Sequence, residues 1–328
     1  MGAGANTSYA TLASTTLANF ANEIFDNVIT NNALANELKK SGNIKVVSGG
    51  AKFTHPVYYN KNNSFGAIAK YGTVPTDLQD PLTRAEYEIK VLAGSVVYSL
   101  VEEAMNAGNK EKLIDYLETL KMDAETSMGE LLGDQLFKPA GSTGANDFDS
   151  IPEIIANSAS TQTINVGGLN SESSGGAAFW QNYAYTTAVG TFNSTQLGIT
   201  AFEAAVNGAT FGRQGPTIGI TTKTIFGLYS VGLTANIRYT DTSRADAGFK
   251  NLLFATIPIM FDDNVAAYYA YFIDTNALKL QVLAQGNMKI TPYVQAYSQL
   301  MSRALLYMLA NLTCGSRRTQ AVVTNITG

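Results

Sequence analysis

The side chains that could carry catalysis in this chain are few and stand far apart. One histidine, His55, and one cysteine, Cys314, are present. A serine or cysteine nucleophile needs a base to take its proton, and His55 is the sole candidate. His55 precedes Pro56 in an apparent strand, so we expect a polar residue on a half-exposed strand and a buried, structural Cys314. A single cysteine excludes an intrachain disulfide and a cysteine-rich metal site.

Two acidic pairs, Glu102-Glu103 and Asp262-Asp263, could in principle supply the acid and base of a glycosidase. A hydrolase is therefore the alternative from another class of function. Adjacent residues on a strand point to opposite faces, so neither pair is aimed at one substrate. A turn or a solvated strand edge is the favoured interpretation of both pairs.

The glycine-rich run around Gly167-Gly168 and Gly175-Gly176 lacks the lysine of a phosphate-binding loop and the spacing of a dinucleotide-binding loop. A flexible loop is expected there. Trp180 is expected to anchor a core or an interface. Arg213 and Arg244 fall in predicted loops, where they either pair with acidic groups of neighbouring copies or remain solvated. We therefore predict no catalytic, cofactor-binding or metal-binding residues, and no cofactor.

Composition favours a subunit that is covered by other subunits. Of the 328 residues, 45% are hydrophobic and only 15% are charged, against a usual charged share of about 25%. The net charge is −4, and the basic runs are limited to Lys39-Lys40 and Arg317-Arg318, which argues against tight DNA binding. The N-terminus lacks the blocks of a secretory signal, and no apolar run is long enough to predict a membrane span.

Residues 1–14 are small and polar and are expected to form an extended arm. The next segment, residues 15–40, is predicted to be a helix that ends at Lys39-Lys40, with Gly42 in the left-handed cap. Its apolar stripe has the three- and four-residue spacing of one helix face, and consists of Leu17, Phe20, Ile24 and Val28.

An extended β-hairpin is predicted next. Gly49-Gly50 separates two β-prone runs, and residues 60–81 form a loop rich in Asn, Gly and Pro. Alternation then places Tyr87, Ile89 and Val91 on one face of the returning strand. A hairpin this long has too few partners within one subunit to be buried, which is a second indication of assembly.

A long helix over residues 109–137 follows, and its length of about 40 Å is large for one domain. Its predicted buried stripe is Leu113, Leu117, Leu120, Ala124, Met128 and Leu131. Residues 138–150 look like a linker. Beyond them we predict a helix started by a capping box at Thr200–Glu203 and a buried strand followed by a helix at residues 216–230. Two strand pairs or long strands should follow, and a last strand should return to an earlier element.

Six runs in this order resemble the tailed-phage major capsid proteins of the Hong Kong-97 fold over roughly residues 15–325. The runs are SGGAKFTHPVYYNKNNSFGAIAKYG, AEYEIKVLAGSVVYS with the long helix after it, NVGGLNSESSGGAAFWQN, RADAGFKNLLFATIPIMFDDN, YFIDTNALKLQV and NLTCGSRRTQAVV.

The resemblance implies an α+β, Hong Kong-97-like fold with an N-terminal arm, an extended loop, a peripheral domain with a long spine helix, and an axial domain. The expected segments are 1–42 (arm and helix), 43–59 (peripheral-domain strand), 60–86 (extended loop), 87–149 (peripheral domain with spine helix), 150–295 (axial domain) and 296–328 (return strands of the peripheral domain).

The same resemblance implies a shell protein, not an enzyme, that assembles as pentamers and hexamers around the double-stranded DNA of a tailed phage. It further implies portal and scaffolding or decoration proteins as partners, DNA enclosed without sequence-specific binding, no membrane, and a place in the virion after assembly in the host cytoplasm. An encapsulin shell is the alternative within the fold. The large scaffolding segment of some relatives is not expected here, so either a separate scaffold serves or the chain is already processed. Lys61 and Lys70 lie in the loop, but crosslinking is not predicted.

Overall fold

The computed structural model describes residues 32–328, except for residues 61, 63, 75, 77–79, 102–109, 159, 163–164, 173–176, 188–189, 193–196, 233–251, 296, 298 and 328. The predicted arm and most of the first predicted helix lie outside the described residues. Helix α3 (Ala33–Lys40) starts after an N-cap at Asn32, whose backbone is extended, so the prediction of one continuous helix over residues 15–40 is wrong at Asn32. Lys39 and Lys40 occupy its last turn, and Gly42 follows with a φ of +67°, as predicted.

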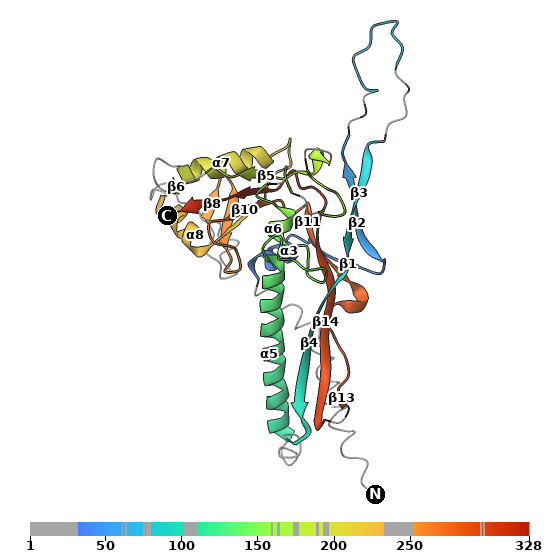
Figure 1. The fold of residues 1–328 in the computed structure, drawn as a ribbon, viewed down its shortest axis with the longest axis vertical. Coiled ribbons are helices and arrows are strands. Elements are labelled where there is room, and N and C mark those ends of the chain that lie inside the picture. The colour runs from blue at the N-terminus through green and yellow to red at the C-terminus, as the bar shows by residue number, and fades with distance from the viewer. Residues whose placement is uncertain are drawn as a thin grey trace.

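The predicted extended hairpin is present. Strand β2 (Lys52–Tyr58) pairs in antiparallel register with β3 (Leu82–Glu88), and His55 lies opposite Ala85. The connecting loop projects away from the rest of the subunit (Figure 1). One face of the hairpin root is packed against the body through Phe53, His55 and Val57. The expectation that the hairpin has too few partners to be buried within one subunit therefore does not hold for its root.

The predicted alternation of the returning strand is wrong beyond Ile89. Tyr87 is buried, but Val91 is exposed and Leu92 is buried. The chain breaks at Ile89 into β3 and β4 (Lys90–Ser99), because it leaves the pairing with β2 and begins a new one with β14. Each partner strand determines separately which face of the returning strand is buried, so the alternation of buried and exposed side chains shifts by one residue after Ile89.

A long sheet forms around β14 (Met301–Cys314), which confirms the prediction that the last strand returns to earlier elements. Its antiparallel neighbours are β4, β11 (Leu278–Leu283), β12 (Lys289–Ile290) and β13 (Val294–Gln295). The parallel strand β1 (Ile44–Val47) completes the sheet beside β11. The chain thus joins its first and last thirds in one sheet.

Helix α5 (Lys110–Leu136) is the predicted long helix, and it runs beside β4 and β14 (Figure 1). Within the predicted stripe Met128 is buried and Leu120, Ala124 and Leu131 are partly buried, whereas the side chains of Leu113 and Leu117 are outside the described part. Leu132 and Leu136 are fully buried although they were not predicted, since the helix is enclosed on more than one side near its C-terminal end.

The predicted linker at residues 138–150 is a packed turn. Asp147 accepts hydrogen bonds from Lys138 Nζ at 2.7 Å, Gln135 Nε2 at 3.0 Å and the Gly144 amide at 2.6 Å. The bond from Lys138, then those from Gly144 and Gln135, lower the pKa of Asp147 to about 2. Phe148 is inserted into the core, so this segment ties α5 to the short helix α6 (Ile151–Ile154).

A second, mixed sheet has the order β5-β15-β10-β7-β9-β8. The strands are β5 (Tyr183–Tyr185), β15 (Ala321–Val323), β10 (Ala270–Ile273), β7 (Ile218–Thr221), β9 (Ile257–Phe261) and β8 (Leu252–Phe254). Helices α7 (Leu197–Ala209) and α8 (Lys223–Gly232) share a core with it. A two-stranded pair, β6 (Gly190–Thr191) with β16 (Ile326–Thr327), lies at its end. The buried β7 and the helix after it are as predicted. Of the two segments predicted as strand pairs or long strands, the first forms the pair β8–β9, whereas the second forms β10 and β11, which do not pair and belong to different sheets.

The capping box predicted at Thr200–Glu203 is wrong, because α7 already begins at Leu197. The sheets also divide the chain differently from the expected segments. Strands β11–β13, within the expected axial segment 150–295, belong to the long sheet, whereas β15, within the expected return segment 296–328, belongs to the second sheet. The chain crosses between the sheets at residues 274–277 and again at residues 315–320.

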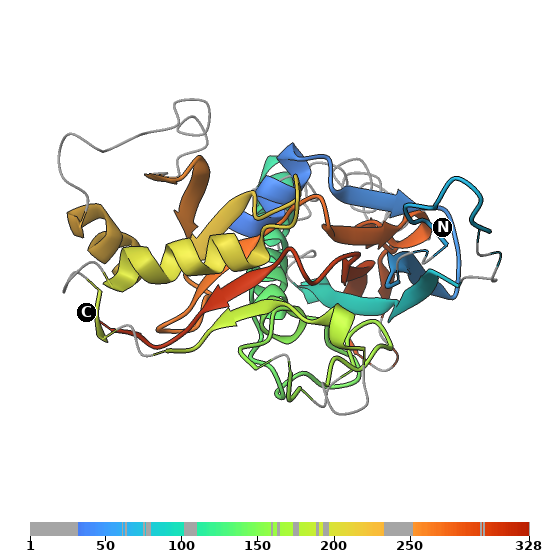
Figure 2. The ribbon, with the colours of Figure 1, turned by 90° about the horizontal axis from the view of Figure 1, so that it is seen from above.

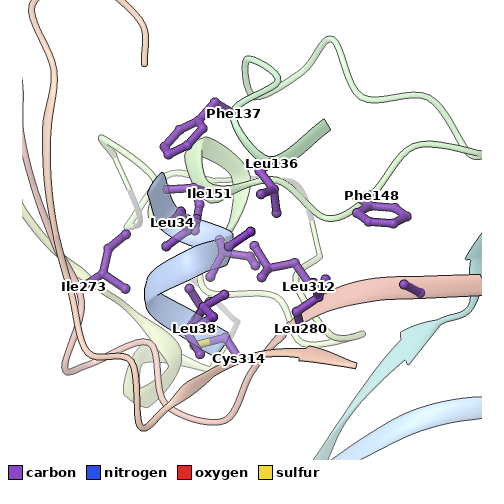
Figure 3. Close-up of a cluster of buried hydrophobic side chains, with 14 of the residues drawn as sticks. Leu34, Leu38, Leu136, Phe137, Phe148, Ile151, Ile273, Leu280, Leu312 and Cys314 are labelled. Atoms are coloured by element: carbon purple, nitrogen blue, oxygen red, sulfur yellow. The ribbon is translucent and has the colours of Figure 1, made fainter. Parts of the chain in front are cut away.

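The main core fills the space where α3, the end of α5, α6 and both sheets meet. Figure 3 shows Leu34 and Leu38 of α3 facing Leu280 and Leu312 of the long sheet, with Leu136 and Ile151 nearby. Seen along α5, the second sheet and the long sheet lie on different sides of this helix (Figure 2). A smaller core holds the far end of the long sheet through Val96, Tyr98, Tyr293 and Ala304.

Candidate assembly surfaces

The loop of the extended hairpin displays apolar side chains to solvent. Phe65 is 85% exposed and Tyr71 is 90% exposed, and Ile68 and Val74 are also exposed. Lys70 Nζ lies 5.5 Å from the centre of the Tyr71 ring, so the side chain of one predicted loop lysine covers a neighbouring aromatic ring; Lys61 is outside the described residues. Exposed aromatic side chains on a projecting loop are typical of a contact with another molecule.

The loop leaves the body from an anchored root. The Tyr59 and Phe179 rings are 5.3 Å apart, and the Tyr59 amide donates to the Pro81 carbonyl across the two legs of the loop. On the buried face, His55 Nε2 lies 2.9 Å from Thr313 Oγ1 of β14 and 2.8 Å from Gln281 Nε2 of β11. The hairpin is therefore joined to the long sheet by packing and by a buried polar cluster.

A second surface is the face of the long sheet that points away from α5. Residues opposite one another in an antiparallel ladder point to the same face, and Ser95, Val97 and Val91 lie opposite Leu305, Arg303 and Leu309. The exposed apolar residues of this end of the sheet and the segment after β13 are Val91, Val97, Val294, Tyr297, Leu300 and Leu305. This end of the sheet is thus apolar on both faces.

A groove of about 330 Å³ runs between α5 and β4. Its walls include Val96, Leu120, Ala124 and Met128, and Asp123 stands at the same surface. The groove explains why the predicted stripe of α5 is only partly buried at Leu120 and Ala124: helix and strand diverge there before the helix reaches the main core.

The two residues that could have formed a nucleophile and its base are both structural. Cys314 is fully buried in the core, and burial raises the pKa of its thiol to about 12. Burial first, and then Lys279, lower the pKa of His55. The prediction of a buried structural cysteine is confirmed. Strand β2 is half-exposed, as predicted, and His55 lies on its buried face because the hairpin root folds onto β11 and β14.

The acidic pair Asp262-Asp263 follows β9 in a turn, and its two carboxylates serve different partners. Asp262 is buried and accepts hydrogen bonds from the amide and the side chain of Asn264. Asp263 is exposed and forms an ion pair with Lys223 at 2.6 Å. The predicted turn is confirmed, and the geometry does not aim both carboxylates at one substrate. Glu102-Glu103 lies outside the described residues.

The glycine-rich segment is more ordered than predicted. Gly167 and Gly168 have φ of +60° and +74° and close a tight turn between the bridged residues Val166 and Leu169, as in a type I′ turn. The Gly167 carbonyl accepts a hydrogen bond from the Glu86 amide, so the turn is attached to β3. Gly175-Gly176 is outside the described part of the chain.

Trp180 is a core residue, which is one of the two roles predicted for it. Its ring is buried, and Nε1 donates to the Val166 carbonyl at 3.0 Å. Arg213 lies in a turn, as predicted, between the bridged residues Phe211 and Gln214. Arg244 lies outside the described residues.

Sequence reasoning missed Arg317, whose side chain is fully buried. Its Nε donates to the Ile154 carbonyl at 2.6 Å, and one Nη donates to Gln162 Oε1 at 2.7 Å and Asn182 Oδ1 at 3.2 Å. The guanidinium thus joins α6, the loop after it and the start of β5. Nothing in the sequence of the pair Arg317-Arg318 indicates that Arg317 is buried and Arg318 is exposed.

No group of three or more potential metal-ligating side chains occurs among the described residues. None of the described helices combines the length and the hydropathy of a membrane-spanning segment.

No protein-family model matches the sequence, and no curated protein matches it. Solved structures do match. A chain of the cyanophage A-1(L) capsid has a TM-score of 0.63 at 14% identity, over 89% of this chain and 93% of that one. A capsid chain of a native GTA particle has a TM-score of 0.58 at 12% identity, over 88% and 90%.

A Mycobacterium phage Ogopogo structure gives a TM-score of 0.53 at 12% identity, over 88% and 91% of the two chains. An encapsulin complex from Synechococcus elongatus is less similar, with a TM-score of 0.51 at 7% identity, over 88% and 87%. Each of these similarities covers 88–89% of this chain, so the likeness is one of the whole fold. The chain has the Hong Kong-97 fold of tailed-phage capsid proteins.

Proposed function

We propose that this chain is the major capsid protein of a tailed phage, which assembles as pentamers and hexamers into an icosahedral shell around the double-stranded DNA genome. The observation that carries the proposal is the fold, shared over nearly the whole chain with the cyanophage capsid chain. The exposed aromatic loop and the apolar outer face of the long sheet support it, because both surfaces lack cover within one subunit.

In this proposal, each exposed surface is covered by another copy. A loop that carries Phe65 and Tyr71 in solvent gains stability only when a neighbour buries them, at about 25 cal/mol per Å² of apolar area. The low charged share of 15% fits a subunit with much of its surface in contacts. We further propose that the long sheet with α5 is the peripheral domain and the second sheet with α7 and α8 is the axial domain.

The proposed partners are the chain itself, a portal protein, and scaffolding or decoration proteins. The shell would enclose DNA without reading its sequence, as the net charge of −4 suggests. Assembly would take place in the host cytoplasm, and the mature location would be the virion. No membrane role is proposed.

We propose no enzymatic activity. The alternative, a hydrolase that uses acidic pairs, predicts that Asp262→Asn and Asp263→Asn abolish a turnover that the wild-type chain shows. The separate partners of these two carboxylates, Asn264 and Lys223, argue against it.

An encapsulin-type compartment is the second candidate, favoured by the likeness to the Synechococcus elongatus encapsulin chain. The contents of purified particles discriminate between the two. Double-stranded DNA in the particles supports the phage shell, and a stoichiometric enzyme cargo supports the compartment.

The test is electron microscopy of the expressed chain, alone and with a candidate scaffold from its own gene neighbourhood. Closed shells, pentamers or hexamers are expected. A chain in which residues 60–81 are replaced by a two-residue turn serves as the matched control, and it should fold but fail to form stable shells. A strictly monomeric wild-type chain under all assembly conditions would contradict the proposal.

A further inference from the structure

A polar cleft of about 520 Å³ lies at the root of the extended hairpin, on the part of the surface where the hairpin meets both sheets. His55 of β2, Lys279 of β11 and Asp274 from the crossing after β10 form one side. Arg213, from the turn after α7, and Gly315, from the crossing after β14, line it as well. The cleft is therefore lined by the hairpin, by the turn after α7 and by both crossings between the sheets.

Among the described residues, the positive side chains of the cleft have no ion-pair partner. Neither Arg213 nor Lys279 forms an ion pair with any residue that the structure describes. Asp274 is the acidic residue of the wall, and its Oδ1 accepts a hydrogen bond from the Asn276 amide within its own turn. The lining of the cleft thus contains two cationic side chains and one carboxylate, and that carboxylate accepts a hydrogen bond within its own turn.

His55 forms a fixed part of the cleft wall. Its Nε2 lies 2.8 Å from the Gln281 side-chain nitrogen and 2.9 Å from Thr313 Oγ1, and that hydroxyl donates to the Lys279 carbonyl at 3.0 Å. Its Nδ1 lies on the side of Gly315, 3.7 Å from the point where a Cβ on that glycine would be. The ring is therefore anchored to β11 and β14 beside the Lys279 side of the cleft.

The turn that carries Arg213 is held in place. Phe211 and Gln214 form a bridge across it, Gly212 takes a φ of +61°, and the Arg318 guanidinium lies 3.9 Å above the Phe211 ring. A guanidinium on a fixed turn and an ammonium are donors that bind an oxyanion.

We propose that this cleft binds a carboxylate side chain of a second copy of the chain, an inference that rests on the proposed shell function. Repeated contacts between identical subunits require complementary patches at two different places on one chain. Asp123, Glu130 and Asp134 of α5 are exposed and form no ion pair with a described residue. Glu130 and Asp134 line a different hollow, beside the turn after β9, so they are available to a neighbour.

Because the cleft joins the hairpin to both sheets, a carboxylate there would fix the direction of the hairpin at the moment when two copies meet. The contact would thus couple the orientation of the loop to assembly. It would also weaken with salt, since partly exposed ion pairs are screened.

The test is zero-length crosslinking with a carbodiimide, which joins an amine to a carboxylate only when the two are in contact. Labelled (¹⁵N) and unlabelled subunits are mixed before assembly, and particles are analysed by mass spectrometry. The expected product joins Lys279 of one isotope to an Asp or Glu peptide of the other. Lys279→Arg removes the reactive amine and should abolish this product, and Lys45→Arg, on the strand beside β11, should leave it unchanged.

Arg213→Gln should lower the mixed product about tenfold, equivalent to about 1.4 kcal/mol. Particles that form normally but give Lys279 products only with Asp274 of the same chain, or none, would overturn this inference alone. Phosphate recovered from washed particles at one per chain, and lost in Arg213→Gln, would also overturn it, because the cleft would then hold phosphate. The absence of any oligomer would overturn both this inference and the proposed function.

Discussion

The packing of α5 predicts that two leucines on one helix differ strongly in their contribution to stability. Leu132 is fully buried in the main core, whereas Leu120 is partly buried and lines the open groove beside β4. Leu132→Ala removes apolar contacts and leaves a cavity in close-packed surroundings, which costs about 3–4 kcal/mol. Leu120→Ala enlarges an existing groove and loses only part of the transfer free energy, or about 1 kcal/mol. Both changes introduce the best helix former, so helix propensity does not account for the difference.

Urea unfolding of the unassembled subunit measures this difference. Trp180 is the only tryptophan, and it is buried in the same core as Leu132, so its fluorescence reports the loss of that core. Because a chain with two sheets need not unfold in one step, the midpoints of the same Trp180 transition are compared between variants, with the slope checked for constancy. Equal shifts for both variants would refute the packing of α5 described above.

Three further outcomes are expected. Phe65→Ser with Tyr71→Ser should change the free energy of unfolding of the subunit by less than about 0.5 kcal/mol, since both rings are exposed, yet sharply reduce particle yield in electron microscopy; unchanged yield would show that the loop makes no essential contact. Gly167→Ala should unfold at clearly lower urea than Gly168→Ala, because both have positive φ but only at Gly167 would a Cβ meet other atoms, at 2.9 Å; equal midpoints would exclude this crowding. Burial lowers the pKa of His55 below its usual 6.5. The unfolded chain therefore binds more protons than the folded subunit at acidic pH, and the stability of the subunit should fall as the pH drops below about 6.5. Urea midpoints measured between pH 5 and 8 should show this fall in the wild-type chain and not in His55→Gln.

The elements that the sequence predicts well are those whose pattern is local. The stripe of α5, the turn signals around the hairpin and the apolar run of β14 each reflect the period of one element. The same local information placed Leu120 on a buried stripe, and it could not show that the helix is enclosed only from Met128 onward. How deeply a face is buried depends on which elements cover it, and that is settled by residues far away in the chain.

The errors of prediction arise where two distant partners compete for one segment. At Ile89 the alternation changes phase because β3 pairs with β2 and β4 pairs with β14. A sequence pattern read along one strand contains no sign of that exchange. The sequence also gives no sign that the chain passes from one sheet to the other between β10 and β11. Both strands are apolar, and only their pairing assigns them to different sheets.

Arg317 shows why the buried polar residues are the part of the structure that the sequence predicts least well. In the sequence, Arg317 stands beside Arg318 as a short basic run, yet one is buried among carbonyl groups and the other covers the Phe211 ring. Burial of a charge is tolerated only where acceptors surround it, and here the acceptors come from Ile154, Gln162 and Asn182. None of these is near Arg317 in sequence.

The two crossings between the sheets are bound to each other, and this explains how a subunit with two sheets keeps one shape. The Gln320 side chain accepts a hydrogen bond from the Asp274 amide at 2.9 Å and donates to the Asp274 carbonyl at 3.2 Å. The side-chain amide of Gln320, in the second crossing, thus satisfies the backbone of the first crossing. Arg317, three residues after Cys314 of the long sheet, binds the Ile154 carbonyl of α6 and attaches that helix to the second crossing. Since Asp274 and Gly315 also line the cleft at the hairpin root, the group that we propose to dock there would act on the junction that sets the relation between the sheets.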